Sequence, residues 1–269
     1  DEPGAILELI DFAYGTGFDI VSVGKGKNNP LDVEATDVTL KEEADRKGLA
    51  PHMLCSFVDG TNTMIELTTV CNATGFIPDV PGCHGITANP KEIANILKRK
   101  DQGGILEKEK VVEYAFGMAP GVFAIVTSEE PEVVDLMKYL GMGEGPNYLL
   151  YRPYHLTSLE TPITIFNAVV EKEASIAPIM GQVADTVMIA KRDCIAGEPV
   201  KGIGRDVVYG EIVPHEIQKK EKWVPISLVN KNAVFKRDVK KGQHITEDDI
   251  YLDEDSIIVK LRRLQDIEE

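Results

Sequence analysis

Apolar residues along the chain recur with two periods, one typical of helices and one typical of strands. Residues 1–17 carry apolar side chains three and four positions apart and end on Gly15 and Gly17, which predicts a helix and its stop. The apolar run 18–23 predicts a buried strand directly afterwards. We therefore expect helix and strand to follow one another from the start of the chain.

The same alternation continues to about residue 170. Further helices are predicted at 36–48, 61–72, 89–97, 128–137 and 160–170, with Ser128 as the N-cap of the fourth. Strands are predicted at 111–116, 121–127 and 148–151, the first two paired around a turn at Pro120-Gly121. This order indicates an α/β (α+β) domain, which we place at residues 1–180.

Beyond about residue 180 the pattern changes to short strands and charged turns, and a repeat appears. The segment KRDCIAGEPV at 191–200 recurs as KRDVKKGQHI at 236–245, so both copies read K-R-D-x-x-x-G-x-x-[VI]. Two copies are too few for a solenoid, so we interpret them as pseudo-twofold halves of one small all-β domain at 181–269. The alternative is chance similarity between two charged turns.

Composition limits the partners of this protein. Hydrophobic residues make up 43% of the 269 positions, charged residues make up 27%, and the net charge is -15. A field of this sign repels nucleic acid and anionic membranes, so we expect neither as a partner. No apolar run has the length of a membrane span and no signal-peptide pattern appears, which predicts a cytoplasmic protein. The four cysteines lack CxxC spacing and indicate isolated buried thiols.

The segment GKGKNNPLD at 24–32 gathers positive and amide groups within this acidic chain. Its candidate ligand groups are Lys25, Lys27, Asn28, Asn29 and Asp32. We expect the segment on a loop that leaves the carboxyl end of the strand at 18–23, where open α/β sheets bind ligands. Such a loop suits a phosphorylated or carboxylated small molecule, with a lysine available for proton transfer. A solvated basic turn is the alternative.

A second polar concentration follows the strand at 148–151. Its candidate substrate-binding residues are Arg152, His155, Thr157 and Ser158, ahead of the helix expected from about Glu160. These groups and the free N–H groups of a helix start suit an anion, although a helix capped by Ser158 or Thr157 needs no ligand. Because both concentrations follow strands of one α/β layer, we predict that Lys25, Lys27, Arg152 and His155 converge on one cleft.

Asp37 and Lys41 stand four residues apart on the helix predicted at 36–48. Such pairs are usually surface ion pairs. The spacing alone therefore leaves their role open.

Five long motifs, in order along nearly the whole chain, resemble one family of oxidoreductases. They are GKGKNNPLD, FVDGTNTMIE, NATGFIPDVPGCHG, APGVFAIV and YRPYHLTSLETP. The chain resembles the homoserine-dehydrogenase-like oxidoreductases that carry a C-terminal SAF (antifreeze-like, β-clip) domain. The branch it resembles is the type II, DXR-like 1-deoxy-D-xylulose 5-phosphate reductoisomerase.

The resemblance implies an NADPH-linked, homodimeric oxidoreductase that acts on a phosphorylated sugar. It also implies a divalent metal as a further cofactor, without indicating which residues bind it. It implies catalytic roles for Lys25, Lys27, Asp32, Asp37 and Lys41. It also implies a glycine-rich dinucleotide-binding region, and this chain carries no GxGxxG fingerprint after a first strand. We therefore expect the main cofactor-binding region to precede residue 1 and this chain alone to be inactive.

Two other functions remain open at this stage. The first is a homoserine-dehydrogenase-like enzyme that acts on another hydroxy acid or sugar, because fold analogy does not fix the substrate. The second is a non-catalytic module that binds a sugar or a protein through the β domain.

Overall fold

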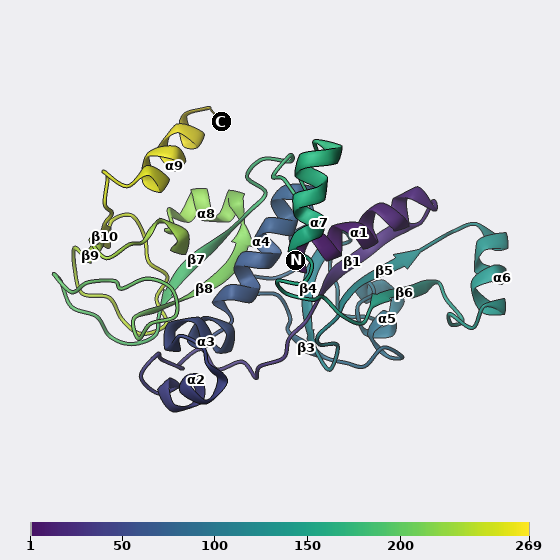
Figure 1. Cartoon of the computed structure of the whole chain (residues 1–269), viewed down its shortest axis with the longest axis horizontal. Helices are drawn as coiled ribbons and strands as arrows, with labels where there is room; N and C mark the ends of the chain where they lie inside the picture. Colours follow the sequence, from purple (N-terminus) through teal and green to yellow (C-terminus); the bar gives the residue numbers. More distant parts are fainter. Residues whose placement is uncertain (1, 269) are drawn as a thin grey trace. The chain divides into compact units, whose positions relative to one another are not determined.

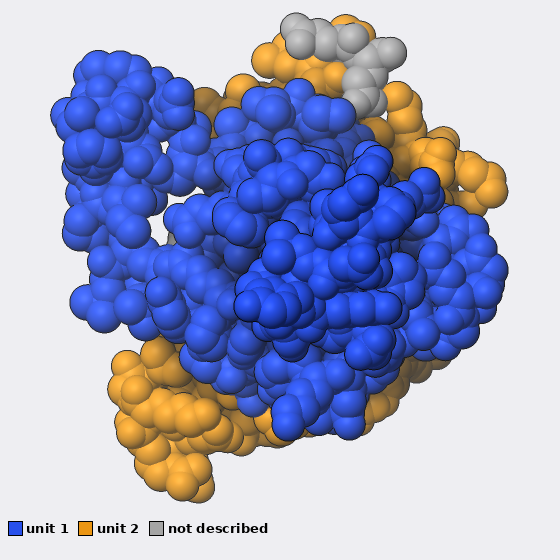
Figure 2. All heavy atoms as spheres, turned by 90° about the vertical axis from the view of Figure 1, so that its right-hand side faces the viewer, with its two compact units in different colours: residues 1–28, 66–183 blue, residues 29–65, 184–269 orange. Residues whose placement is uncertain are grey.

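The computed structural model describes residues 2–268 and separates them into two compact units (Figure 1). Unit 1 comprises residues 2–28 and 66–183, and unit 2 comprises residues 29–65 and the residues from 184 onward (Figure 2). Unit 2 therefore contains a segment from the N-terminal half of the chain in addition to the C-terminal region. None of the helices formed by residues 2–268 is both long and apolar enough to cross a membrane.

Unit 1 is built on a mixed six-stranded sheet of order β2-β4-β1-β5-β6, with β3 paired to β4. Its strands are β1 (Asp19–Gly26), β2 (Ile77–Pro78), β3 (Ile86–Thr87), β4 (Val111–Phe116), β5 (Val122–Thr127) and β6 (Asn147–Arg152). β1 runs parallel to β4 and antiparallel to β5. The predicted pairing of 111–116 with 121–127 is therefore wrong, because β1 lies between these two strands and pairs with both.

Helices cover both faces of this sheet. The helices with residues in unit 1 are α1 (Glu2–Gly15), α4 (Thr61–Thr74), α5 (Ile93–Ile96), α6 (Pro131–Tyr139) and α7 (Thr161–Phe166), with a 3-10 turn at Lys100–Gln102 and a π-helical turn at Asn167–Glu171. α1 packs across β1, β5 and β6 (Figure 1). The other face buries Phe123 and Ile125 of β5 with Ile93 of α5. The mixed α/β class expected from the sequence is confirmed.

Two helix starts differ from the prediction. The helix expected at 36–48 is α2 (Lys41–Lys47), and it ends at Gly48 in the left-handed conformation. α6 begins at Pro131 after Glu130, so Ser128 is not its N-cap. Pro131 needs no partner for a backbone N–H and suits the first helical position, while the Ser128 hydroxyl accepts the N–H of Glu130 at 3.2 Å.

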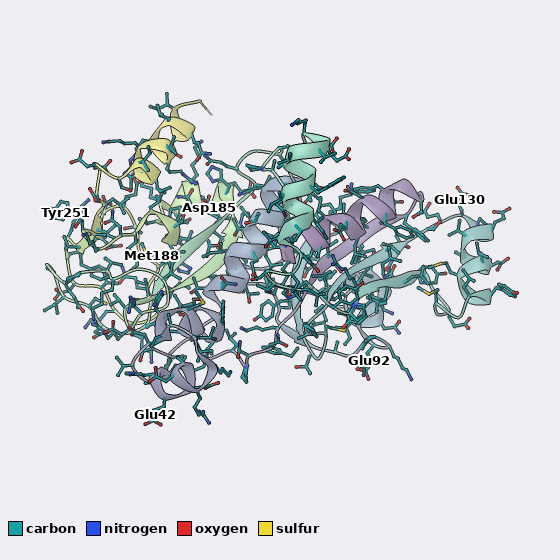
Figure 3. All side chains as sticks on the ribbon, viewed as in Figure 1. Glu42, Glu92, Glu130, Asp185, Met188 and Tyr251 are labelled. Carbon is teal, nitrogen blue, oxygen red and sulfur yellow. The ribbon has the colours of Figure 1, made fainter. Side chains whose placement is uncertain are left out.

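Unit 2 combines antiparallel strand pairs with helices. Its elements are α2, α3 (Pro51–Val58), β7 (Ala184–Ala190), β8 (Val208–Pro214), α8 (His215–Glu221), a 3-10 turn at Ile226–Leu228, β9 (Val234–Phe235), β10 (Ile250–Tyr251) and α9 (Ile257–Glu268). Met188 of β7 enters the core and packs with Phe235 and Val239 (Figure 3). Because residues 184–268 include α8 and α9, the expected all-β character of this region is not confirmed.

The two K-R-D-x-x-x-G segments occupy equivalent positions in unit 2. Cys194 and Val239, which match in the repeat, exchange backbone hydrogen bonds of 2.9 and 3.0 Å. The Asp193 carboxylate accepts the backbone N–H of Lys241 at 3.0 Å. In the matching bond, the Asp238 carboxylate accepts the N–H of Ala196 at 2.9 Å.

The glycines of the repeat follow the same symmetry. Gly197 donates its N–H to Phe235, and Gly242 donates its N–H to the matching Ala190, at 2.9 and 2.8 Å. Both glycines have left-handed backbones, with φ of 82° and 81°. The predicted pseudo-twofold repeat is therefore confirmed by reciprocal hydrogen bonds.

Candidate functional site

Lys25 lies inside strand β1 rather than on a loop. Its neighbours Gly24 and Gly26 make this possible, because a Cβ on Gly24 would stand 1.9 Å from the Glu113 carbonyl oxygen and one on Gly26 would stand 2.2 Å from the Ala119 nitrogen. Only glycine allows the neighbouring backbones to approach this closely. The first three residues of GKGKNNPLD are thus strand, and the predicted loop begins after Gly26.

The ammonium of Lys25 is buried between two carboxylates of unit 1. Its Nζ atom lies 2.5 Å from Glu2 Oε2 of α1 and also contacts Glu66 Oε2 of α4. The other oxygen of Glu2 lies 3.2 Å from His155 Nε2. Lys25, Glu2, Glu66 and His155, here named the Lys25 cluster, therefore form a continuous polar group whose members are far apart in sequence.

The charges in the Lys25 cluster stabilise one another. Burial lowers the pKa of Lys25, but the negative charges of Glu66 and Glu2 outweigh burial and raise it above its usual value. Burial raises the pKa of Glu2. The hydrogen bond with His155 and the charge of Lys25 lower it by more, so the pKa of Glu2 lies below its usual value. The site therefore holds a protonated amine beside the ionised Glu2 carboxylate at neutral pH.

Strand register brings Arg152 to the same face of the sheet as Lys25. Lys25 pairs with Val122 of β5, and Val122 pairs with Arg152 of β6. Directly paired residues point to the same face of a sheet, here the face that α1 covers. Arg152 donates to Glu8 of α1 at 2.8 Å and to Glu160 at 2.5 Å.

The structure thus brings three of the four residues predicted to converge onto one face. Lys25 and His155 meet at Glu2, and Arg152 lies in the same row as Lys25. Lys27 is buried, and its backbone N–H binds the Ala115 carbonyl at 2.9 Å. Asn28 follows at the end of this segment of unit 1, whereas Asn29 is the first residue of the next segment, in unit 2.

Thr157 and Ser158 do not cap α7. The N-cap residue is Glu160, and its side chain accepts the backbone N–H of Leu156 at 2.9 Å as well as the hydrogen bond from Arg152. Ser158 has a left-handed backbone with φ of 69°. The N-cap predicted at Ser158 or Thr157 is therefore wrong, because the turn before α7 is closed by Glu160 instead.

The remaining predicted catalytic residues belong to unit 2. Asp32 accepts the backbone N–H of Glu34 at 3.0 Å, as in an Asx turn. Asp37 binds Arg205 Nη1 at 2.7 Å. Lys41 pairs with Asp45 at 2.7 Å on the exposed surface of α2, so the structure does not pair Asp37 with Lys41.

Sequence reasoning missed the acidic partners of the site. Glu2 and Glu66 supply the carboxylates around Lys25, and each sits on a helix whose pattern shows only an amphipathic face. Glu113 of β4 is also fully buried, and its carboxylate accepts the backbone N–H groups of His84, Gly85 and Tyr114 at 2.8 to 3.1 Å. A charged residue inside the apolar run 111–116 was the available signal for Glu113.

Burial is the main cause of the raised pKa of Glu113, despite these three hydrogen bonds. His84 also binds Asp79 through its ring at 2.8 Å. The Glu113 carboxylate therefore holds the 83–85 loop against β4.

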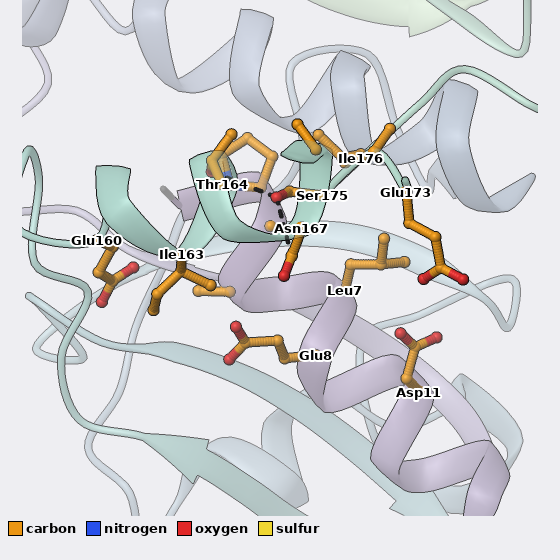
Figure 4. Close-up of a pocket in the computed structure, with 15 residues that line it drawn as sticks. Leu7, Glu8, Asp11, Glu160, Ile163, Thr164, Asn167, Glu173, Ser175 and Ile176 are labelled. Atoms are coloured by element: carbon orange, nitrogen blue, oxygen red, sulfur yellow. Dashed lines mark hydrogen bonds between the residues drawn. The ribbon is translucent and has the colours of Figure 1, made fainter. Parts of the chain in front are cut away.

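A groove of about 640 Å³ lies between α1 and α7 in unit 1 (Figure 4). Glu8, Asp11, Glu160 and Glu173 line it, and no lysine or arginine is among its lining residues. Two of these carboxylates, Glu8 and Glu160, bind Arg152 from the groove side. An acidic lining of this kind repels a phosphate group.

Residues 2–268 contain no group of three or more His, Cys, Asp or Glu side chains arranged to hold a metal ion. They also present no glycine-rich cradle for a dinucleotide on β1, because Gly24 and Gly26 are packed against protein backbone. Strand β1 therefore offers no binding site for the pyrophosphate of NADPH.

Residues 1–161 match the family model described as oxidoreductase DRL, catalytic domain. This range includes β1 through β6 and every residue of the Lys25 cluster. No curated protein matches the chain.

Proposed function

The chain belongs to the oxidoreductase DRL family, and from this premise we propose that it is the catalytic and C-terminal portion of an NADPH-dependent enzyme. The proposed reaction is reduction or isomerisation of a phosphorylated ketose such as 1-deoxy-D-xylulose 5-phosphate. The buried, protonated amine of Lys25 carries this proposal, because it lies within the matched catalytic domain and two carboxylates keep it charged.

Reduction of a ketone needs a proton at the carbonyl oxygen as hydride reaches the carbon. In the proposed enzyme Lys25 donates that proton to the carbonyl oxygen and is protonated again from solvent, while Glu2 holds the amine of Lys25 and contacts His155. NADPH is the proposed hydride source when bound. The carboxylates of Glu66 and Glu2 raise the pKa of Lys25 and so keep its amine in the protonated form that a proton donor requires.

The other predicted residues enter the proposal through the family resemblance. Substrate binding is assigned to Asn28, Asn29, Arg152, His155, Thr157 and Ser158, and further catalytic roles are assigned to Lys27, Asp32, Asp37 and Lys41. The region from 181 onward is proposed to be the SAF-type domain, and the enzyme is proposed to act as a cytoplasmic homodimer. The confirmed pseudo-twofold repeat is consistent with a β-clip arrangement but does not identify one.

Activity of the enzyme that contains this chain tests the proposal. It is assayed with NADPH and 1-deoxy-D-xylulose 5-phosphate, and with homoserine as the competing substrate. Lys25→Met is expected to lower kcat by about 100-fold or more, the range of a lost general acid. Lys27→Ala is a second variant, and it leaves the ion pairs of Lys25 with Glu2 and Glu66 intact.

Lys240→Ala serves as the matched control, because Lys240 is exposed and pairs with Asp193 in unit 2. Circular dichroism establishes that each variant is folded. Turnover of homoserine alone would replace the proposed substrate class. A folded enzyme that binds NADPH and turns over neither substrate would favour a non-catalytic binding module.

A further inference from the structure

A pocket of about 680 Å³ in unit 2 is lined by basic residues that have no role in the proposed reaction. Its charged lining residues are Lys201, Arg205, Lys231, Asp37 and Asp206. Three cations face two carboxylates, so the pocket has one positive charge in excess within a chain of net charge -15. Its volume lies in the range of small-molecule sites, about 300–1,000 Å³.

The positive charge in this pocket is only partly neutralised by the protein. Lys201 pairs with Asp206 at 2.9 Å, and Arg205 pairs with Asp37 at 2.7 Å. Lys231 forms no ion pair within residues 2–268. The backbone N–H groups of Lys201 and Ile203 likewise donate to no acceptor in the part of the chain that the structure describes.

The walls of the pocket are fixed by one buried amine. Lys191 Nζ, whose side chain is 2% exposed, binds the Ala35 carbonyl at 2.6 Å, the Arg205 carbonyl at 2.8 Å and Asp59 at 2.7 Å. It therefore ties the segment before Asp37 to the loop that carries Arg205. Donors held in place before binding lose little freedom when a ligand arrives, which favours affinity.

Glycine packing fixes the same loop from a second side. A Cβ on Gly204 would stand 1.9 Å from the His52 carbonyl oxygen of α3, and Gly202 and Gly204 both have left-handed backbones. The 200–206 loop thus rests directly on helix α3. Its position is set by the fold rather than by a ligand.

We propose that this pocket binds the phosphate group of a small phosphorylated metabolite. A phosphate monoester carries up to two negative charges and several acceptor oxygens, which match Lys201, Lys231 and the unpaired N–H groups of the loop. The net charge of -15 repels polyanions, so the ligand is a small molecule and not a nucleic acid. This inference goes beyond the proposed redox reaction, because binding requires neither NADPH nor turnover.

Calorimetric titration of the chain with glycerol 3-phosphate tests the proposal, with inorganic phosphate and citrate as comparison anions. We expect one saturable site for glycerol 3-phosphate, weakened by added NaCl because the attraction is electrostatic. Lys231→Ala should weaken binding about fivefold, and Lys201→Ala with Lys231→Ala about twentyfold or more. Amide NMR shifts on binding should concentrate in residues 200–206 and 229–231.

Lys240→Ala is the control, because it removes an exposed lysine of unit 2 that lies outside the pocket. Its affinity for glycerol 3-phosphate should equal that of the unmodified chain. Absence of binding, or equal affinity in the double variant, would overturn the proposal. Binding lost in Lys25→Met but kept in the double variant would place the anion in unit 1, and tighter binding of citrate would replace phosphate by a carboxylate ligand.

Discussion

Asp185 of β7 holds a buried negative charge between two basic partners (Figure 3). It binds His215 Nδ1 at 2.6 Å and Arg262 Nη1 of α9 at 2.7 Å. Burial raises the pKa of Asp185, but the hydrogen bonds with His215 and Arg262 outweigh burial and bring it below the usual 3.8. The ion pairs therefore stabilise the fold above pH 3.8, and this contribution is lost as pH falls through the lower, folded-state pKa.

Asp185→Asn is expected to lower the free energy of unfolding by about 2 kcal/mol at pH 6, because it removes hydrogen bonds between charged groups. Since the variant lacks the titrating carboxyl, the difference from the unmodified chain should shrink as pH falls below about 4. Urea unfolding between pH 6 and pH 3.5 measures both effects. A difference that stays constant with pH would show that Asp185 has an ordinary pKa in the folded state.

Strand β1 is central to unit 1 because it pairs on both sides and carries Lys25. Gly24 sits between Glu113 of β4 and Phe123 of β5, with no space for a methyl group. Gly24→Ala should therefore destabilise the chain by about 3 kcal/mol through overpacking. Gly15→Ala is the matched control, since a Cβ there meets nothing within 4 Å and its backbone is not left-handed.

Thermal and urea unfolding of the two glycine variants measure the change in the free energy of unfolding. Gly15→Ala should remain within about 0.5 kcal/mol of the unmodified chain. If Gly24→Ala were as stable as Gly15→Ala, there would be space for a methyl group at Gly24 between β4 and β5, contrary to the structure. In that case the position of Lys25 would also need revision.

Each compact unit buries an apolar core, and the single tryptophan of the chain lies in only one of these units. Trp223 lies in unit 2, whereas the fully buried thiol of Cys71 lies in unit 1. Lys191→Met leaves the Asp59 carboxylate of unit 2 buried without its cation, at a cost of about 3 kcal/mol. We expect the unfolding midpoint seen by Trp223 fluorescence to fall more than the midpoint seen by labelling of Cys71.

Asp59→Asn in the Lys191→Met background provides the control, because it removes the unpaired charge and should restore part of the lost stability. Coincident midpoints for Trp223 and Cys71 in every variant would mean that the two units unfold as one cooperative body. Helix α4 is the element that would couple them, because it contributes residues to both units.

Local pattern was sufficient to detect the first helix and the repeat. Residues 1–17 carry a helical period and a glycine stop, and α1 forms there; the K-R-D-x-x-x-G spacing fixes two equivalent turns, because each copy carries its own aspartate and left-handed glycine. The helix and its stop depend on neighbours within a few residues. The two turns are recognisable from the repeated letters, but the hydrogen bonds that pair them join residues 42 and 48 positions apart. The positive charge of GKGKNNPLD was visible in the same way.

Tertiary structure alone decided how that charge is used. The carboxylates that surround Lys25 come from Glu2 and Glu66, which are 23 and 41 residues away, so no local spacing connects them. No local spacing predicts that β1 lies between β4 and β5. Nor does it predict that residues 29–65 belong to unit 2, where Lys191 binds Asp59 across 132 residues. A buried ammonium group needs a carboxylate partner, and the order of strands in a sheet depends on which strands pack together. Both are properties of the folded chain and not of any one segment.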